Sequence, residues 1–214
     1  MARKPGARRL ANKELVFADY PDFRPNLTPR EIFASGSFGG TYWRPIRSNV
    51  TKKAHRGAHR RFPSSWWSGI PEDHLTREWR DYDTAINKYD VKVGTELGFW
   101  ERKKWIKASH PYGWVHWYCD FYNGRRGADD ERQVKRWVQT AGPRSRFRMA
   151  LLNRIKRLGR RCGDYEVSPK IRQTLQHWAY RITSRDCASG AKPRTRRARR
   201  TRRARRARRT FSLF

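Results

Sequence analysis

Residues 111–124 constrain the fold of this chain more strongly than any other segment, because they concentrate six aromatic side chains within eleven residues. Four of these side chains fall within an arc of about 100° when the segment is drawn as a helix. The four are Trp114, Trp117, Tyr118 and Phe121. Such an aromatic stripe is typical of a helix packed in a core, so we expect a buried helix here. The alternative is a platform on which nucleic-acid bases stack, which requires exposed rings on a basic surface.

Several other segments repeat apolar residues at helical spacing. They are residues 71–86, 95–106, 129–141, 147–158 and 168–183. Ser168 followed by Pro169 is a favourable helix start. Residues 20–46 carry four prolines and closely spaced glycines, which disfavour long helices. We therefore expect a mainly α fold, in which a compact aromatic-rich domain of about five helices is wrapped by an irregular N-terminal segment.

Charge and composition divide the chain into three parts. Residues 1–14 are expected to form a flexible basic arm, residues 15–184 a single α-rich globular domain, and residues 185–214 a disordered arginine-rich tail. The tail contains two consecutive TRRARR copies and ends in FSLF. Only 36% of the residues are hydrophobic, but ten Trp, nine Tyr and ten Phe are among them. Each buried aromatic removes about 150–250 Å² from water, so a modest core suffices for one domain.

The net charge of +32 comes from 51 Lys and Arg against 19 Asp and Glu. Residues 192–210 hold twelve of these cations and no acid, which leaves +20 on the rest of the chain. Charge of this size favours polyanionic partners, of which nucleic acid is the most common. Arginine pairs with phosphate through a two-pronged fork, and each neutralised phosphate adds about −0.9 to the slope of log K against log salt.

The expected nucleic-acid contacts are arginines in two places. In the tail they are Arg196, Arg197, Arg199, Arg200, Arg202, Arg203, Arg205, Arg206, Arg208 and Arg209. In the domain they are Arg125, Arg126, Arg132 and Arg136, with further basic residues on the helices at 144–161 and 168–183. Arg125 continues the aromatic stripe by one turn, so it is expected to stack on a ring. Arg126 then points elsewhere and is expected to be the freer phosphate ligand.

No cofactor and no metal are expected. Three cysteines, Cys119, Cys162 and Cys187, have no short spacing, which argues against a disulfide framework or a zinc module and favours reduced thiols. Asp129 and Asp130 diverge by about 100° on a helix, so we expect them to stabilise its start rather than to bind Mg²⁺. No apolar run approaches the roughly 18 residues of a membrane span, so none is expected.

The stretch HPYGWVHWYCDFYNGRRGADDERQVKRW, followed by AGPRSRFR and SPKIRQTLQHWAY, resembles a family of proteins found in fungi, algae, some plants and large algal DNA viruses. The pattern that carries the resemblance is PYGW-x2-WY-x2-F-x2-GRR-x2-DDxRQ-x2-RW, and the resemblance extends over residues 30–183. It implies a self-standing domain to which the arginine tail is an addition. It implies no particular activity, and no functional residue follows from it.

Together these features favour a non-enzymatic, sequence-tolerant nucleic-acid-binding protein, with DNA favoured over RNA, that acts in compaction, packaging or association. We expect it inside the cell, in the nucleus or in a virion or nucleoprotein particle. One alternative is a structural, minor capsid-like component of a virion or ribonucleoprotein particle, whose tail contacts neighbouring proteins. Another is a nuclease or strand-transfer enzyme that uses Asp129, Asp130 or Tyr180. Tyr180 shares one expected helix with Arg172 and His177, a residue set found in DNA strand-transfer enzymes.

Overall fold

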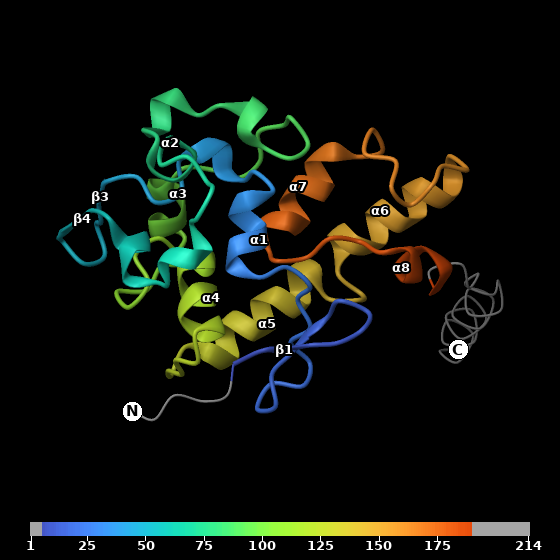
Figure 1. The fold of residues 1–214 in the computed structure, drawn as a ribbon, viewed down its shortest axis with the longest axis horizontal. Coiled ribbons are helices and arrows are strands. Elements are labelled where there is room, and N and C mark those ends of the chain that lie inside the picture. The colour runs from blue at the N-terminus through green and yellow to red at the C-terminus, as the bar shows by residue number, and fades with distance from the viewer. Residues whose placement is uncertain (1–5, 190–214) are drawn as a thin grey trace, which may run out of the picture.

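The aromatic segment forms helix α4 (Trp114–Tyr122), which lies at the centre of the structure and is buried on every side. The structure, a computed structural model, describes residues 6–189 (Figure 1). All four stripe residues are buried, which confirms that the stripe belongs to the core. The opposite side of the same helix is buried as well, including His116, Cys119 and Asp120. Helix α4 therefore has no exposed face on which bases could stack.

The described chain is mainly helical, as the sequence predicts, and its strands are short. The helices are α1 (Pro29–Ala34), α2 (Asp73–Thr76), α3 (Leu97–Arg102), α4, α5 (Asp130–Ala141), α6 (Arg146–Arg157), α7 (Pro169–His177) and α8 (Ser184–Ser189). The strands pair as two antiparallel hairpins, β1 (Arg8–Arg9) with β2 (Leu15–Val16) and β3 (Ile46–Arg47) with β4 (Ala54–His55). The longest helices are α4, α5, α6 and α7, each of nine residues or more. The other described helices are shorter, so the expected number of about five helices is not confirmed.

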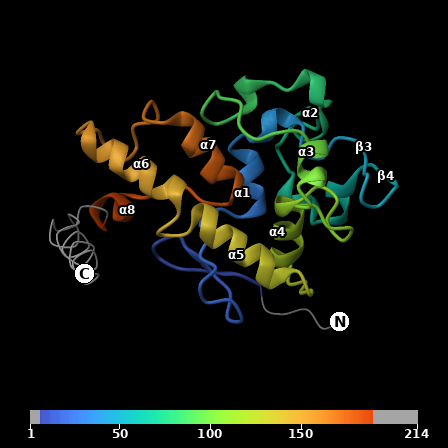
Figure 2. The same ribbon diagram turned by 180° about the vertical axis from the view of Figure 1, so that it is seen from behind.

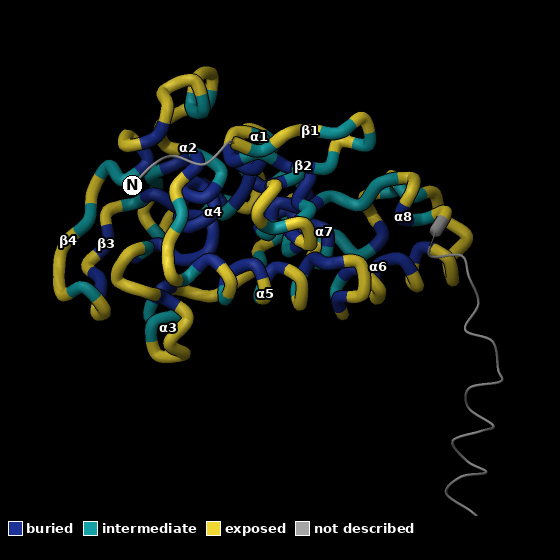
Figure 3. The backbone as a smooth tube through the Cα atoms, turned by 90° about the horizontal axis from the view of Figure 1, so that it is seen from below, coloured by how far each residue is buried: buried dark blue, intermediate teal, exposed yellow. Residues whose placement is uncertain are grey.

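Helix α6 packs against α5, α7 and α8, while α4 packs against α1 and α5. The β3–β4 hairpin lies at one end of the longest axis, and α6 with α8 lies at the other (Figures 1 and 2). Buried backbone runs through α4 and the neighbouring parts of α5, whereas the hairpin tips and the outer side of α6 are exposed (Figure 3). No helix within residues 6–189 has the length and apolarity needed to cross a bilayer.

The irregular N-terminal segment contributes its own aromatic rings to the core. Phe23 makes edge-on or tilted contacts of 5.1–6.5 Å with rings on α4 and α5. Those rings belong to Trp114, Trp117, Tyr118, Phe121 and Trp137. The backbone N–H groups of Asn26 and Leu27 both donate to the carbonyl of Ala179, which ties this segment to the end of α7. Edge-to-face pairs of this kind stabilise a core beyond the area that they bury.

Residues 71–86 do not form the continuous helix that their periodicity predicts. Helix α2 lasts one turn, and two separate 3-10 turns follow it. The backbone N–H groups of this region donate instead to carbonyls of a glycine loop, as Arg77 does to Gly40 and Asp83 to Gly39. Gly36 at φ 86° belongs to the same loop, and a Cβ there would stand 1.9 Å from the Ile86 oxygen. Tertiary hydrogen bonds to this loop replace the helical ones.

Both expected domain boundaries differ from the observed ones. Arg8 and Arg9 belong to β1 rather than to a flexible arm, and Arg9 pairs with Glu31 at 2.6 Å. At the other end, the chain does not leave the domain at Ser184, because α8 continues to Ser189. Asp186 of α8 is buried and forms an ion pair with Arg148 of α6. Residues 1–5 and 190–214 lie outside the described part.

Two cysteines are paired, contrary to the expectation of reduced thiols. Cys162 and Cys187 form a disulfide, with their Cα atoms 6.1 Å apart, and Cys119 is a buried free thiol. The bond joins the loop after α6 to helix α8. The cysteines are 25 positions apart in the sequence, a spacing that carries no signal, because only the packing of α8 on α6 brings them together.

We predict that C187S lowers the free energy of unfolding by about 2–4 kcal/mol, because the disulfide restricts the unfolded chain across a 25-residue loop. Urea denaturation of the oxidised proteins measures this difference, and dithiothreitol should make the two proteins converge. A count of three free thiols in the unfolded, unreduced wild-type chain would show that the pairing is wrong.

Candidate functional site

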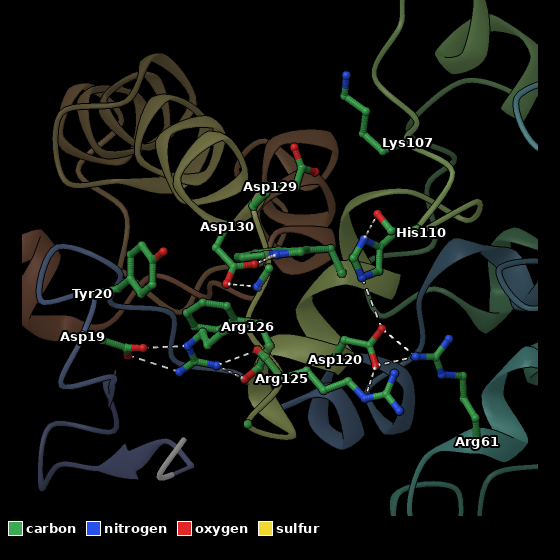
Figure 4. Close-up of a pocket in the computed structure, with 16 residues that line it drawn as sticks. Asp19, Tyr20, Arg61, Lys107, His110, Asp120, Arg125, Arg126, Asp129 and Asp130 are labelled. Atoms are coloured by element: carbon green, nitrogen blue, oxygen red, sulfur yellow. Dashed lines mark hydrogen bonds and ion pairs between the residues drawn. The ribbon is translucent and has the colours of Figure 1, made fainter. Parts of the chain in front are cut away.

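A hollow with a cavity volume of about 1560 Å³ opens where helix α4 ends (Figure 4). We call it the charged pocket. Its charged side chains come from Asp19, Arg61, Lys107, His110, Asp120, Arg125, Arg126, Asp129 and Asp130. Most of these residues belong to the motif-rich segment 107–130, and loops from residues 19–20 and from Arg61 complete the wall.

Asp120 is the electrostatic centre of the charged pocket. The Arg61 Nη2 group donates to both Asp120 oxygens at 2.8 Å, and the His110 Nε2 atom lies 3.2 Å from the carboxylate. Arg125 Nε approaches the same carboxylate at 3.6 Å. Only 8% of the Asp120 side chain is exposed. Burial alone would raise the pKa of Asp120, but the hydrogen bond from His110 and the charge of Arg61 outweigh it and lower the pKa.

His110 connects this carboxylate to a hydroxyl group at the surface. The His110 Nδ1 atom lies 2.9 Å from Ser109 Oγ, while its Nε2 atom faces Asp120. With the proton on Nε2 and donated to Asp120, Nδ1 accepts a hydrogen bond from Ser109. A hydroxyl, an imidazole and a carboxylate in series can draw a proton from the hydroxyl. Lys107 and Arg125 at the mouth of the pocket can hold an anion nearby.

The structure reverses the expected roles of Arg125 and Arg126. The Arg126 guanidinium lies 3.7 Å from the centre of the Phe121 ring and pairs with Asp19 at 2.7 Å, with 16% of its side chain exposed. Arg125 is 59% exposed. The reason is Gly124, whose φ of 84° ends the helical phase, so that the position one turn beyond the stripe no longer lies on it. Arg125 is therefore the more accessible of the two arginines.

Arg132 and Arg136 lie on α5 and line a second hollow. Arg132 donates twice to Asp129, at 2.5 and 2.7 Å. The Arg136 Nη1 group donates to Gln133 Oε1 at 2.9 Å, and its guanidinium lies near two indole rings. Burial, assisted by the charge of Arg132, lowers the pKa of Arg136 to about 10. The four arginines expected in the domain are therefore divided between two separate hollows.

The acids at the start of α5 make structural contacts. Asp130 is buried and accepts hydrogen bonds from Trp117 Nε1 at 2.7 Å and from the Gly127 N–H at 2.9 Å. Asp129 pairs with Arg132. This agrees with the expected role of both acids at a helix start. Among residues 6–189, no group of three or more His, Cys, Asp or Glu side chains is arranged to hold a metal ion.

The three residues considered for strand transfer are buried in the core. The Tyr180 hydroxyl donates to Asp186 at 2.8 Å, and burial raises the pKa of Tyr180. Arg172 donates to the backbone carbonyls of Val167 and Cys162, and His177 stacks on the Phe38 ring. These contacts do not form a common site. The residue pattern of α7 is therefore explained by the packing of its apolar stripe in the core.

An exposed group of arginines lies at the C-terminal end of α6. We call it the α6 basic end; it consists of Arg154, Arg157, Arg160 and Arg161. Arg160 pairs with Asp164 at 3.5 Å, but the other three form no ion pair within the described part of the chain. Helix α8, with which that part ends, packs against α6. The expected tail contacts, Arg196 to Arg209, lie outside the described residues.

Sequence reasoning missed the central group of the charged pocket. Neither Asp120 nor His110 is among the site residues predicted from the sequence. Only nine residues separate the two, and Pro111 favours a helix start between them, so this short spacing is a local signal that a His–Asp pair is feasible. Arg61 had no such signal, because it lies 59 residues from its partner.

In comparisons with known proteins, no protein-family model, curated protein or solved structure matches this chain. The resemblance to the fungal, algal, plant and viral family therefore stays a prediction.

We predict that acid destabilises the fold through His116 and His177. Burial is the main cause that lowers the pKa of each to about 3, and His177 Nε2 accepts a hydrogen bond from the Phe38 N–H, which protonation would break. Their stabilising contribution is complete above the unfolded pKa of about 6.5 and is lost as the pH falls towards 3.

The free energy of unfolding should therefore fall by about 3–4 kcal/mol between pH 7 and pH 5, measured by urea denaturation. H177N should remove about half of this pH dependence. H74N, at a half-buried position on α2, is the control and should keep the full dependence. An equal pH slope in wild type and H177N would contradict the assignment.

We predict that D120N destabilises the protein by about 3 kcal/mol, because it leaves Arg61 and His110 without their carboxylate. The control is D73N, which removes an exposed carboxylate paired with Arg77 and should cost less than about 1 kcal/mol. Urea denaturation at pH 7 compares the two. If both variants lose the same small amount, Asp120 does not organise the charged pocket.

Proposed function

We propose that this protein is a non-enzymatic, sequence-tolerant nucleic-acid-binding protein, with DNA favoured over RNA, acting in the nucleus or in a nucleoprotein particle. The observation that carries the proposal is the α6 basic end and its position beside α8. The chain continues from α8 into residues 192–210, which hold twelve cations and no acid. Cys162, which directly follows Arg161, is bonded to Cys187 of α8, so the last described helix is tied to the α6 basic end.

The pairing state of the arginines supports this surface over the sequence-predicted Arg126 and Arg132. An exposed guanidinium without a carboxylate partner can bind phosphate without first breaking an ion pair. Within residues 6–189, Arg154, Arg157 and Arg161 meet this condition. Arg126 and Arg132 are already paired with Asp19 and Asp129, which makes them weaker candidates than the sequence indicated.

A second, smaller set of phosphate contacts is proposed at the mouth of the charged pocket. Arg125 and Lys107 are exposed there, and Arg125 reaches Asp120 only at 3.6 Å. Arginine and lysine side chains at a surface attract the phosphate backbone without reading the base sequence. The proposed binding is therefore tolerant of sequence and sensitive to salt.

We predict that the triple variant R154Q/R157Q/R161Q binds duplex DNA more weakly and with a salt dependence less steep by about 2–3 in log K against log salt. A chain ending at Ser189 should lose more affinity than the triple variant, because it lacks twelve cations. Fluorescence anisotropy of two labelled duplexes of unrelated sequence measures both effects and tests sequence tolerance.

The matched control is R47Q/K52Q/K53Q, which removes the same charge from the β3–β4 hairpin at the opposite end of the molecule (Figure 1). This control should keep nearly all of the wild-type affinity. The proposal fails if the α6 triple variant and the shortened chain both bind as the wild type does. Cleavage of the DNA recovered after incubation with Mg²⁺ would contradict the non-enzymatic part.

A further inference from the structure

A hollow of about 740 Å³ lies between α3, α5, the end of α7 and the segment 79–95. We call it the aromatic groove. Its half-buried or exposed rings include Trp79, Tyr82, Phe99, Trp100, Trp105 and Trp178. Trp114 of the α4 stripe also lines the hollow, but it is buried. Most of these rings are half-buried, and Trp178 packs against Trp114 with the ring centres 4.7 Å apart. Trp105 is 43% exposed, so it offers the most open ring surface in the groove.

Trp105 is the most accessible ring in the aromatic groove. Its indole lies 5.7 Å from the Phe99 ring with the two planes nearly perpendicular, and the Arg136 guanidinium lies 5.8 Å from its centre, so two neighbours hold a ring that stays 43% exposed. An exposed, fixed indole is a favourable surface for a planar ligand, because stacking costs little side-chain entropy when the ring is already held.

The aromatic groove also contains a cation that lacks an acidic partner. The Arg136 guanidinium lies 5.8 Å from the Trp105 ring centre and 5.4 Å from that of Trp178. Within residues 6–189 no carboxylate forms an ion pair with Arg136, and its side chain donates to the neutral Gln133 amide. Its pKa is lowered, mainly by burial, which indicates that the charge is desolvated without being neutralised.

These features select one class of ligand. The rings require a planar group, and the unneutralised Arg136 requires an anion next to it. Lys92 does not line the groove, but it lies 4.9 Å from the ring centre of Trp79, which does, so a second positive charge near the groove disfavours cationic ligands. A nucleobase attached to a phosphate satisfies both requirements. In a duplex the base faces are covered by neighbouring base pairs, so only an unpaired base can use the Trp105 ring.

We propose that the aromatic groove binds single-stranded nucleic acid, with one base stacked on Trp105 and an adjacent phosphate paired with Arg136. This inference rests on the proposed function and adds a preference for unpaired bases to it. Stacking accepts every base, because each has a π-face, so the groove is consistent with sequence tolerance. The α6 basic end, by contrast, contacts phosphates of either strand form.

The test compares W105A and R136Q with wild type on a labelled single strand of mixed sequence and on its duplex. We expect W105A to weaken single-strand binding about tenfold and to leave duplex affinity unchanged. R136Q should weaken single-strand binding and reduce its salt slope by about 0.7. W105F, which keeps a ring, should retain most of the single-strand affinity. Fluorescence anisotropy gives each affinity, and thermal melting confirms that the variants fold.

The matched control is Y165A, which removes an equally accessible ring, 49% exposed, that lies outside the groove. Y165A should change neither the single-strand affinity nor the duplex affinity. If W105A and R136Q both bind single strands as the wild type does, the proposed role of the aromatic groove is wrong. The proposed function is tested separately, by the binding of the α6 triple variant and the shortened chain to duplex DNA. Free AMP that binds as tightly as the strand, and displaces it, would overturn the single-strand assignment in favour of a mononucleotide site.

Discussion

The packing of Phe23 against the rings of α4 and α5 is the interaction on which the rest of this structure depends. Phe23 comes from an irregular loop, yet it contacts five rings on two helices. This cluster holds α4 in the core, and Asp120 on the same helix lies beside His110 and Arg61. It also fixes the rotation of α5, which carries Trp137 into the core and leaves Arg136 on the groove side.

The aromatic residues of this chain have two distinct roles, and exposure separates them. The rings of α4 are covered on all sides and stabilise the domain. The rings around Trp105 border a hollow, together with an arginine that no acid neutralises. The arginines divide in a similar way. Arg126 and Arg132 are held closely by carboxylates, whereas Arg125 is exposed and approaches Asp120 only at 3.6 Å. Three arginines of the α6 basic end, Arg154, Arg157 and Arg161, form no ion pair within residues 6–189. The amino-acid composition does not distinguish buried from exposed aromatics, or paired from unpaired arginines.

Local signals in the sequence predicted α4, α5, α6 and α7, because their apolar stripes and starting residues agree with the packing they meet. The failures have tertiary causes. Residues 71–86 carry a helical period, but hydrogen bonds to the glycine loop at 36–40 override it. The exchange of roles between Arg125 and Arg126 follows from the turn at Gly124. The Cys162–Cys187 bond and the Arg61–Asp120 pair join residues far apart in sequence, so no local pattern reveals them.

The two proposed surfaces respond differently to salt, which gives them separable roles. Phosphate contacts at the α6 basic end lose affinity as salt rises, because the counterions released on binding become more concentrated in solution. Stacking on Trp105 releases no counterion, so its contribution changes little with salt. Each phosphate contact has a slope of about −0.9 on duplex DNA but only about −0.7 on a single strand, so duplex affinity falls faster and the preference for single strands should widen as ionic strength increases. Charge supplies most of the affinity for either form, and the aromatic groove supplies the discrimination.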